Sequence, residues 1–123
     1  MATTKIQKEY LDDELVEVLA STDTSTATPT PIGNAKRNFY TLTALALNAT
    51  FAAPSGTPAN GNVLLIRYLD NATARTLSFN AIYRAVGVTL PTTTVISKTG
   101  YLLAIYNSAG SGTWDVVQVS VQT

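Results

Sequence analysis

Apolar and polar positions alternate along the chain from Phe39 onward, which predicts β-strands. Tyr40, Leu42 and Ala44 alternate with threonines, and the same period of two continues from Leu47 to Ala53. The run from Val63 to Leu69 is apolar on both of its faces, as a central strand is. The same reasoning predicts further strands over residues 74–79, 101–106 and 114–121, with Pro91 placing residues 87–94 at a sheet edge or in a loop.

Turn-forming residues separate these strands. The segment at 53–62 is rich in Gly, Pro and Asn, and residues 107–113 form a Gly and Ser loop of hairpin type. The DNAT sequence at 70–73 predicts a hairpin that pairs Val63–Leu69 with Ala74–Phe79 in antiparallel fashion. About six or seven short strands with turns about every 8 to 12 residues predict an all-β fold, a small antiparallel β-sandwich or barrel of jelly-roll-like type.

The first 20 residues carry a different pattern, an acidic arm predicted to form a short helix. Thr4 and Gln7 have the spacing of a capping box, and apolar residues recur at intervals of three and four. The stretch Leu15–Leu19 is rich in branched residues and is also compatible with a short strand, and this alternative stays open. The apolar stripe is a candidate assembly surface and consists of Leu11, Leu15, Val18 and Leu19.

A Thr- and Pro-rich stretch at residues 21–31 separates this arm from the rest. Its prolines lack amide donors and favour extended backbone, so the stretch is expected to be a spacer with few internal hydrogen bonds. We therefore expect an arm with its linker over residues 1–31 and a β-rich module over residues 32–123. The arm either packs on its own module or reaches a neighbouring subunit, and the linker favours the second arrangement.

Composition narrows the possible chemistry. The 123 residues include no His and no Cys, which excludes imidazole and thiolate catalysis, imidazole or thiolate metal sites and disulfides. A net charge of zero gives no electrostatic reason for binding nucleic acid or an anionic membrane, and no apolar run is long enough for a membrane span. The N-terminus has no signal-peptide pattern, so we expect an unprocessed protein made in the cytoplasm.

Charge is scarce and unevenly placed. Only 13% of the residues are charged, fewer than the roughly 25–35% of a soluble surface, so part of the surface is expected to lie against other subunits. Residues 1–23 hold two lysines against six acids, a net charge of −4, and the remainder holds six cations against two acids, a net charge of +4. An acidic arm thus precedes a basic module.

No pattern of an active site emerges from the residues that remain. Asp70 and Asp115 are the only acids of the module and are interpreted as a turn residue and an edge charge. The acids at 12, 13, 14 and 17 lack the spacing of a calcium loop, so no metal or cofactor is predicted. Arg67, Arg75 and Arg84 are too few for a nucleic-acid groove and are expected to form cross-strand or intersubunit pairs. Aromatic residues are expected mainly in the core or an interface, with a sugar-stacking surface as the alternative; the candidates are Tyr68, Tyr83 and Trp114.

Four stretches of the module resemble a structural module of tailed-bacteriophage virion proteins, found in fibre and other appendage proteins. They are TPTPIG, NFYTLTALALNATFAAPSGTP, GNVLLIRYLDNATARTLSFNAIYRAVGVTLPTTTV and YLLAIYNSAGSGTWDVV, within residues 28–121. The resemblance implies symmetric oligomers, most often trimers, and carries no catalytic motif. In fibres this module is one part of a long chain, whereas here it follows only a short acidic arm.

The sequence therefore predicts a non-enzymatic virion protein made in a bacterial host. The first expectation is a homotrimeric capsid decoration or cement protein, or the base of a head fibre, that binds the major capsid protein or other virion proteins. The alternative is a tail-fibre-type module that binds a host surface glycan or another receptor through its aromatic residues and loops.

Overall fold

Eight β-strands build the protein, and the computed structural model describes residues 18–123. No helix occurs within that part of the chain. The strands are β1 (Leu19–Thr24), β2 (Arg37–Leu45), β3 (Ala49–Phe51), β4 (Val63–Asp70), β5 (Leu77–Phe79), β6 (Tyr83–Ala85), β7 (Gly100–Asn107) and β8 (Thr113–Val121). The all-β prediction is confirmed.

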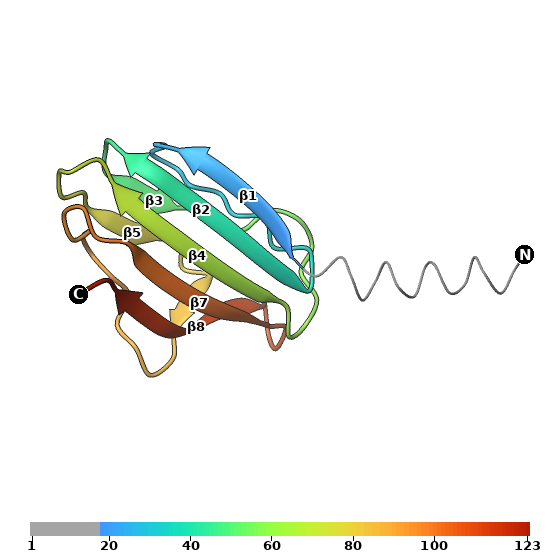
Figure 1. The fold of residues 1–123 in the computed structure, drawn as a ribbon. Helices are drawn as coiled ribbons and strands as arrows, with labels where there is room; N and C mark the ends of the chain where they lie inside the picture. The colour runs from blue at the N-terminus through green and yellow to red at the C-terminus, as the bar shows by residue number, and fades with distance from the viewer. Residues whose placement is uncertain (1–17) are drawn as a thin grey trace, which may run out of the picture.

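Six of these strands form one mixed sheet in the order β1-β2-β4-β7-β8-β6 (Figure 1). Strands β1, β2 and β4 run parallel to one another, β7 is antiparallel to both β4 and β8, and β6 is parallel to β8. The apolar run predicted to be central is β4, which is hydrogen-bonded on both sides, and β1 and β6 are the edge strands.

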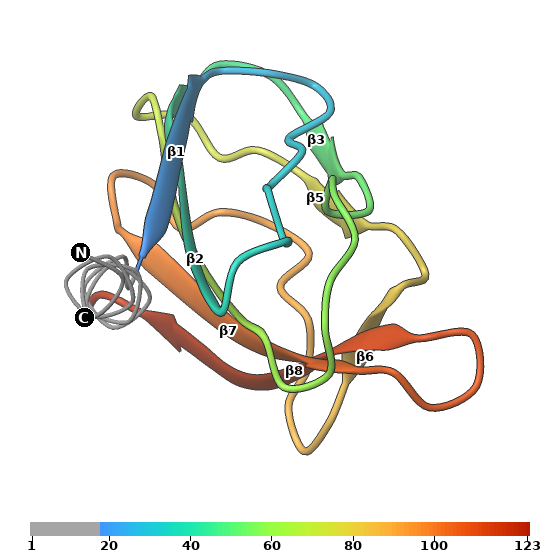
Figure 2. The same cartoon turned by 90° about the vertical axis from the view of Figure 1, so that its right-hand side faces the viewer.

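The two remaining strands, β3 and β5, pair in parallel and form a separate small sheet. Figure 2 shows this pair facing the concave side of the large sheet. Phe51 of β3 and Leu77 of β5 belong to the same buried cluster as Leu64 and Ile66 of β4. The core therefore lies between the large sheet and the β3–β5 pair.

Aromatic rings connect the two sheets through this core. Tyr40 of β2 meets Phe51 of β3 edge to face at 6.5 Å between ring centroids, and Phe51 stacks on Phe79 of β5 at 5.0 Å. Phe79 in turn meets Tyr83 of β6 edge to face at 5.6 Å. Each such pair is worth about 0.5–1.5 kcal/mol beyond its buried area, so this row of rings fixes how the small sheet sits on the large one.

The stretch expected to be a free spacer is instead part of the folded body. Leu19–Thr24 is β1, and the residues after it lie along the small sheet, where the carbonyls of Ala27 and Pro29 accept the amides of Thr50 and Ala52 at 2.9 Å. Pro29 and Pro31 are buried. A proline lacks an amide donor but keeps its carbonyl, so Pro29 and Pro31 still pair as acceptors with Ala52 and Ser55, which corrects the expectation of a free spacer.

The predicted hairpin at residues 70–73 is also corrected. The chain does turn after Asp70, but it leaves the large sheet there, and β5 pairs with β3 in parallel. Four of the six pairings between named strands are parallel, against the antiparallel prediction. Long connections over residues 25–36 and 46–62 pass through the second layer and allow β1, β2 and β4 to run in the same direction.

Several strand predictions are confirmed within a few residues, namely β2, β4, β7 and β8, and the loop of residues 108–112 does join β7 to β8 as a hairpin. Residues 87–94 form no named strand, and Thr93 makes only an isolated bridge with Thr76. The short strand β6 was not predicted. Three residues carry too little alternation to be recognised.

The helix predicted for the arm lies outside the described residues, together with Leu11 and Leu15. Val18 and Leu19, the other two members of the stripe, are described and are not helical. Val18 directly precedes β1, and Leu19 is its first residue, opposite Asn38 of β2. The last part of the expected stripe therefore belongs to the sheet.

Gly100 provides a test of how closely the sheet packs. It pairs with Tyr68 across β4 and β7, and a Cβ atom at this position would overlap the buried Tyr68 ring. We expect Gly100→Ala to lower the free energy of unfolding by about 1–3 kcal/mol, measured by urea denaturation. Ser78→Ala, at an exposed strand position, is the control. Equal stability of the two variants would contradict this packing.

Candidate functional site

The convex side of the six-stranded sheet, which we call the outer face, is the most distinctive surface of the molecule. Neighbouring strands place Phe39, Leu65 and Leu103 side by side in one row across β2, β4 and β7. Val63 lies beside Ile105 in the next row. Side chains alternate along a strand, so these residues point away from the core that their buried neighbours fill. An apolar band therefore crosses the outer face, between polar positions such as Thr41 and Gln118.

A hollow of about 230 Å³ lies on this face at the end of the sheet where the described chain begins. Its lining is almost wholly apolar in character, apart from Arg37 and Asn38, and consists of Val18, Arg37, Asn38, Phe39, Val63, Leu65 and Leu103. Val18 is half exposed, at 51%. The first described residue of the chain thus forms one wall of the hollow.

Two arginines flank the apolar rows. Arg37 begins β2 and lines the hollow, and Arg67 lies in β4 two residues beyond Leu65. The Arg67 guanidinium stands 4.9 Å from the centre of the Phe39 ring, within cation–π range. It also donates a long hydrogen bond of 3.5 Å to the Thr41 hydroxyl. The outer face therefore combines apolar side chains with positive charge.

Further along the same face, a second and larger hollow of about 400 Å³ surrounds Tyr101. Thr99, Ser120 and Gln122 contribute hydroxyl and amide groups to its wall, and Val121 contributes an apolar one. Tyr101 is 38% exposed. Unlike the first, this hollow is lined by an aromatic residue together with polar groups.

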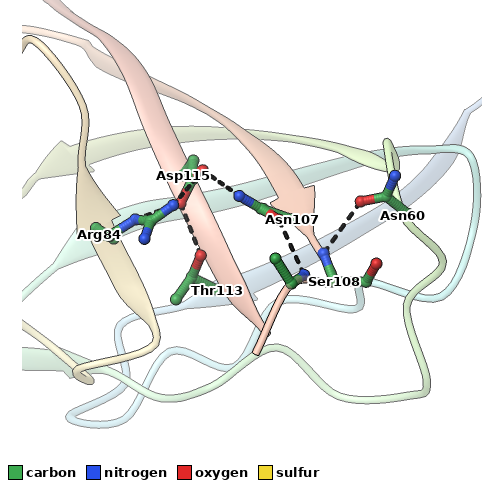
Figure 3. Close-up of polar contacts among 7 residues, drawn as sticks. Asn60, Arg84, Asn107, Ser108, Thr113 and Asp115 are labelled. Atoms are coloured by element: carbon green, nitrogen blue, oxygen red, sulfur yellow. Dashed lines mark hydrogen bonds and ion pairs between the residues drawn. The ribbon is translucent and has the colours of Figure 1, made fainter. Parts of the chain in front are cut away.

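Asp115 is the centre of a polar network at one end of the sheet (Figure 3). Arg84, its partner across β6 and β8, donates Nε and Nη2 to the two carboxylate oxygens at 2.9 and 2.8 Å. The Thr113 hydroxyl donates at 2.7 Å and the Asn107 amide at 3.3 Å. Each carboxylate oxygen of Asp115 thus accepts two hydrogen bonds. The expected cross-strand pairing of Arg84 is confirmed.

This network lowers the pKa of Asp115 to about 2, mainly through the Arg84 hydrogen bonds and then through Thr113. The ionised form is thereby stabilised in the folded protein. Because the folded pKa lies below the ordinary value of 3.8, the stabilisation is complete above about pH 4 and is lost as the pH falls toward 2.

Unfolding measured as a function of pH tests this coupling. We expect Asp115→Asn to be less stable than the natural chain above about pH 4, with the difference shrinking between about pH 4 and 2 as the natural carboxylate takes up its proton. Arg84→Gln should reduce the same pH dependence, since it removes the principal cause of the shift. A stability difference that stays constant from pH 6 to pH 2 would contradict it.

Asp70 is a buried carboxylate with a structural role at the C-terminal end of β4, away from the Asp115 network. It accepts the Thr94 hydroxyl at 2.7 Å and the amides of Ala72 and Ser97 at 3.0 and 2.9 Å. Burial acts to raise the pKa of Asp70, but these hydrogen bonds and the charge of Arg75 together lower it. The carboxylate holds the turn after β4 against the loop that leads to β7, as its interpretation as a turn residue anticipated.

The two acids of the module do not form a pair. Asp115 lies beside Ile105, which lies beside Val63 at the start of β4, whereas Asp70 ends that strand. The length of β4 at about 3.3 Å per residue separates them by about 23 Å. Paired carboxylates that cleave glycosidic bonds stand about 5–9.5 Å apart, so these two do not have that geometry.

The three candidate aromatics occupy the core. Trp114 is 1% exposed and packs against Tyr106, with 5.2 Å between the ring centres, and Tyr83 donates its hydroxyl to the Ala52 carbonyl at 2.8 Å. Tyr68 is also buried, and its hydroxyl has no hydrogen-bond partner within the described residues. The alternative of a sugar-stacking surface built from these rings is corrected, because none presents a ring face to solvent.

Within residues 18–123, no group of three or more acidic side chains is placed to hold a metal ion. The acidic cluster of residues 12–17 lies outside that range. The same part of the chain contains no helix long and apolar enough to cross a membrane.

The outer face itself was not recognised as a site from the sequence. The sequence feature that could have indicated it is the run Val63–Leu69, which is apolar on both sides and is interpreted from the sequence only as a central strand. Comparison of the chain with models of protein families, with curated proteins and with solved structures finds no match.

Proposed function

We propose that this protein is a non-enzymatic structural component of a tailed-bacteriophage virion, a homotrimer attached to the capsid surface as a decoration or cement protein or as the base of a head fibre. The observation that carries the proposal is the apolar outer face on a chain with only 13% charged residues. The sequence resemblance described above supplies the viral context.

The exposed apolar side chains support assembly with other subunits. Ile105 is 38% exposed, in the row next to the partly covered Phe39, Leu65 and Leu103. Monomeric proteins rarely leave contiguous apolar patches larger than a few hundred Å² open to water. Burying this face against identical subunits in a closed ring removes it from water and needs no catalytic chemistry.

The N-terminal segment available for attachment is shorter than the sequence suggested. Residues 19–31 belong to the body, so the arm of the proposal is residues 1–17, which hold five acids and two lysines. Many copies bound to one capsid add weak contacts into a firm attachment through multivalency. In this proposal the two sheets, with the core between them, act as an incomplete β-sandwich that withstands mechanical load.

The hollow around Tyr101 supports a second function, the binding of a host surface glycan. A partly exposed tyrosine beside hydroxyl and amide groups offers a sugar both an apolar surface and hydrogen-bond partners. This function predicts that Tyr101→Ala abolishes binding to purified envelope polysaccharide while the stability stays near that of the natural chain. Absence of binding by the natural chain would leave only the structural function.

Light scattering after size-exclusion chromatography tests the oligomeric state. We expect the natural chain to elute with three times the mass of the 13.0 kDa chain. Leu65→Asp places a charge on the outer face without entering the core, and we expect it to shift the mass toward that of one chain while the circular dichroism spectrum is retained. A natural chain that stays monomeric at high concentration would contradict the trimer.

Deletion of residues 1–17 tests the arm. The shortened chain keeps every described strand, so we expect it to fold but to coat purified capsids poorly, as measured by co-sedimentation. Deletion of residues 2–3 alone is the matched control. A chain lacking residues 1–17 that coats capsids as well as the control would remove the role of the arm.

A further inference from the structure

The outer face has a hollow at its edge that no other described segment fills, and the chain enters the fold there. We propose that this face binds residues 1–17 of a neighbouring copy, so that the copies of the oligomer exchange their N-terminal segments. The inference rests on the homo-oligomer proposed above and names the segment that holds it together. In this arrangement residues 1–17 act on the capsid indirectly, because they join the copies whose many contacts add up on the capsid surface.

The position of Val18 supports this segment as the occupant. Val18 forms part of the wall of the hollow, and Leu19 opens the edge strand β1. Residues 1–17 therefore join the described chain at the edge of the apolar rows, which we call the rim. The proposed ring places each rim at the contact with the next copy, so that every segment lies close to a neighbouring face.

The sequence at this junction favours a neighbouring copy over the chain's own face. Glu14–Leu19 contains no Gly, Pro, Asn or Asp, the residues that reverse a chain. Val16 and Val18 are β-branched and favour extended backbone, so the helix that contains Leu11 and Leu15 is expected to end before Val16. We therefore expect the segment to continue in line with β1, away from its own sheet and toward the next molecule.

The apolar residues of the segment match the rows of the outer face. In the helix predicted from the sequence, Leu11 and Leu15 stand about 6 Å apart along one side. Phe39, Leu65 and Leu103 come from adjacent strands spaced about 4.8 Å apart. If the helix lies across the strands, the distance between its two leucines is close to the distance between adjacent strands. The leucines can then contact apolar residues of neighbouring strands, as an amphipathic helix does in an apolar groove.

Charge complements this apolar match. Residues 1–17 carry two lysines and five acids, whereas residues 18–123 carry six cations and three acids. Arg37 and Arg67 lie on the outer face, and Asp115, at its margin, is already paired with Arg84. The carboxylates of the segment thus meet positive charge on either side of the apolar rows, which fixes its orientation more than its affinity.

The absence of cysteine makes a direct test possible, because every disulfide must come from introduced residues. Leu15→Cys is placed in full-length chains with one affinity tag, and Leu65→Cys in full-length chains with another. The two are co-expressed and oxidised mildly. Each chain has one cysteine, so a disulfide between the two tags joins different copies.

We expect a mixed disulfide between the two tagged chains that forms at least about tenfold faster than with the control, because docking raises the effective concentration of the thiols. The control pairs Leu15→Cys with Ser78→Cys, an exposed strand position on the small sheet. A rate equal to that of the control, in chains that light scattering shows to be oligomeric, would overturn the segment exchange and leave the oligomer intact. A monomer in light scattering would overturn the oligomer itself.

A chain with both Leu15→Cys and Leu65→Cys distinguishes the source of the segment. Exchange between copies predicts chains linked into dimers and larger species on a denaturing gel without reductant. A disulfide confined to single chains would show that the segment folds onto its own face and would overturn the exchange.

The charge match has its own readout in the mixed-disulfide assay. We expect Arg37→Glu combined with Arg67→Glu, in the chain carrying Leu65→Cys, to slow the cross-link several-fold at low salt and less at high salt. Lys98→Glu, a charge reversal away from the apolar rows, should leave the rate unchanged. Equal rates for the two variants would remove the electrostatic part of the inference.

Discussion

Packing of the concave side of the six-stranded sheet against the β3–β5 pair is the interaction on which the rest of the structure depends. The row of rings from Tyr40 through Phe51 and Phe79 to Tyr83 crosses from one sheet to the other, and β4 contributes buried leucine, isoleucine and tyrosine side chains beneath it. A two-stranded sheet cannot persist alone in water. Its position on the large sheet therefore determines which neighbouring strands of that sheet can run parallel.

This arrangement covers one side of the large sheet only. The small sheet and the segment around Pro29 and Pro31 lie on the concave side, and the convex side keeps Phe39, Leu65 and Leu103 near the surface. This band of apolar side chains departs from the usual pattern, because a sheet with one solvated face normally turns polar residues toward the solvent. The apolar convex side, the scarcity of charge and the acidic N-terminal segment are thus three aspects of one proposal about assembly.

Much of the fold was predictable from local patterns. Alternation identified β2, β7 and β8, and the doubly apolar run identified β4 as central. Partners and directions were not predictable, because the hairpin chemistry at residues 70–73 describes only a change of direction and each residue of β5 pairs with a residue 28 positions earlier, in β3. Of the candidate site residues, Tyr68, Tyr83 and Trp114 lie in the core, since an aromatic residue in an alternating strand has the same local signature on either side of a sheet.

The sequence by itself determined the all-β class, most of the long strands, the residue types that are missing and the opposite charges of the N-terminal segment and the body. The tertiary structure alone decided that residues 19–31 belong to the body, that the strands run mainly in parallel and that the apolar residues of β4 are divided between a covered and an open side. The physical reason is that periodicity acts along one strand, whereas pairing and burial depend on segments distant in sequence, and a carbonyl such as that of Pro29 takes its partner from whichever amide the fold brings within reach.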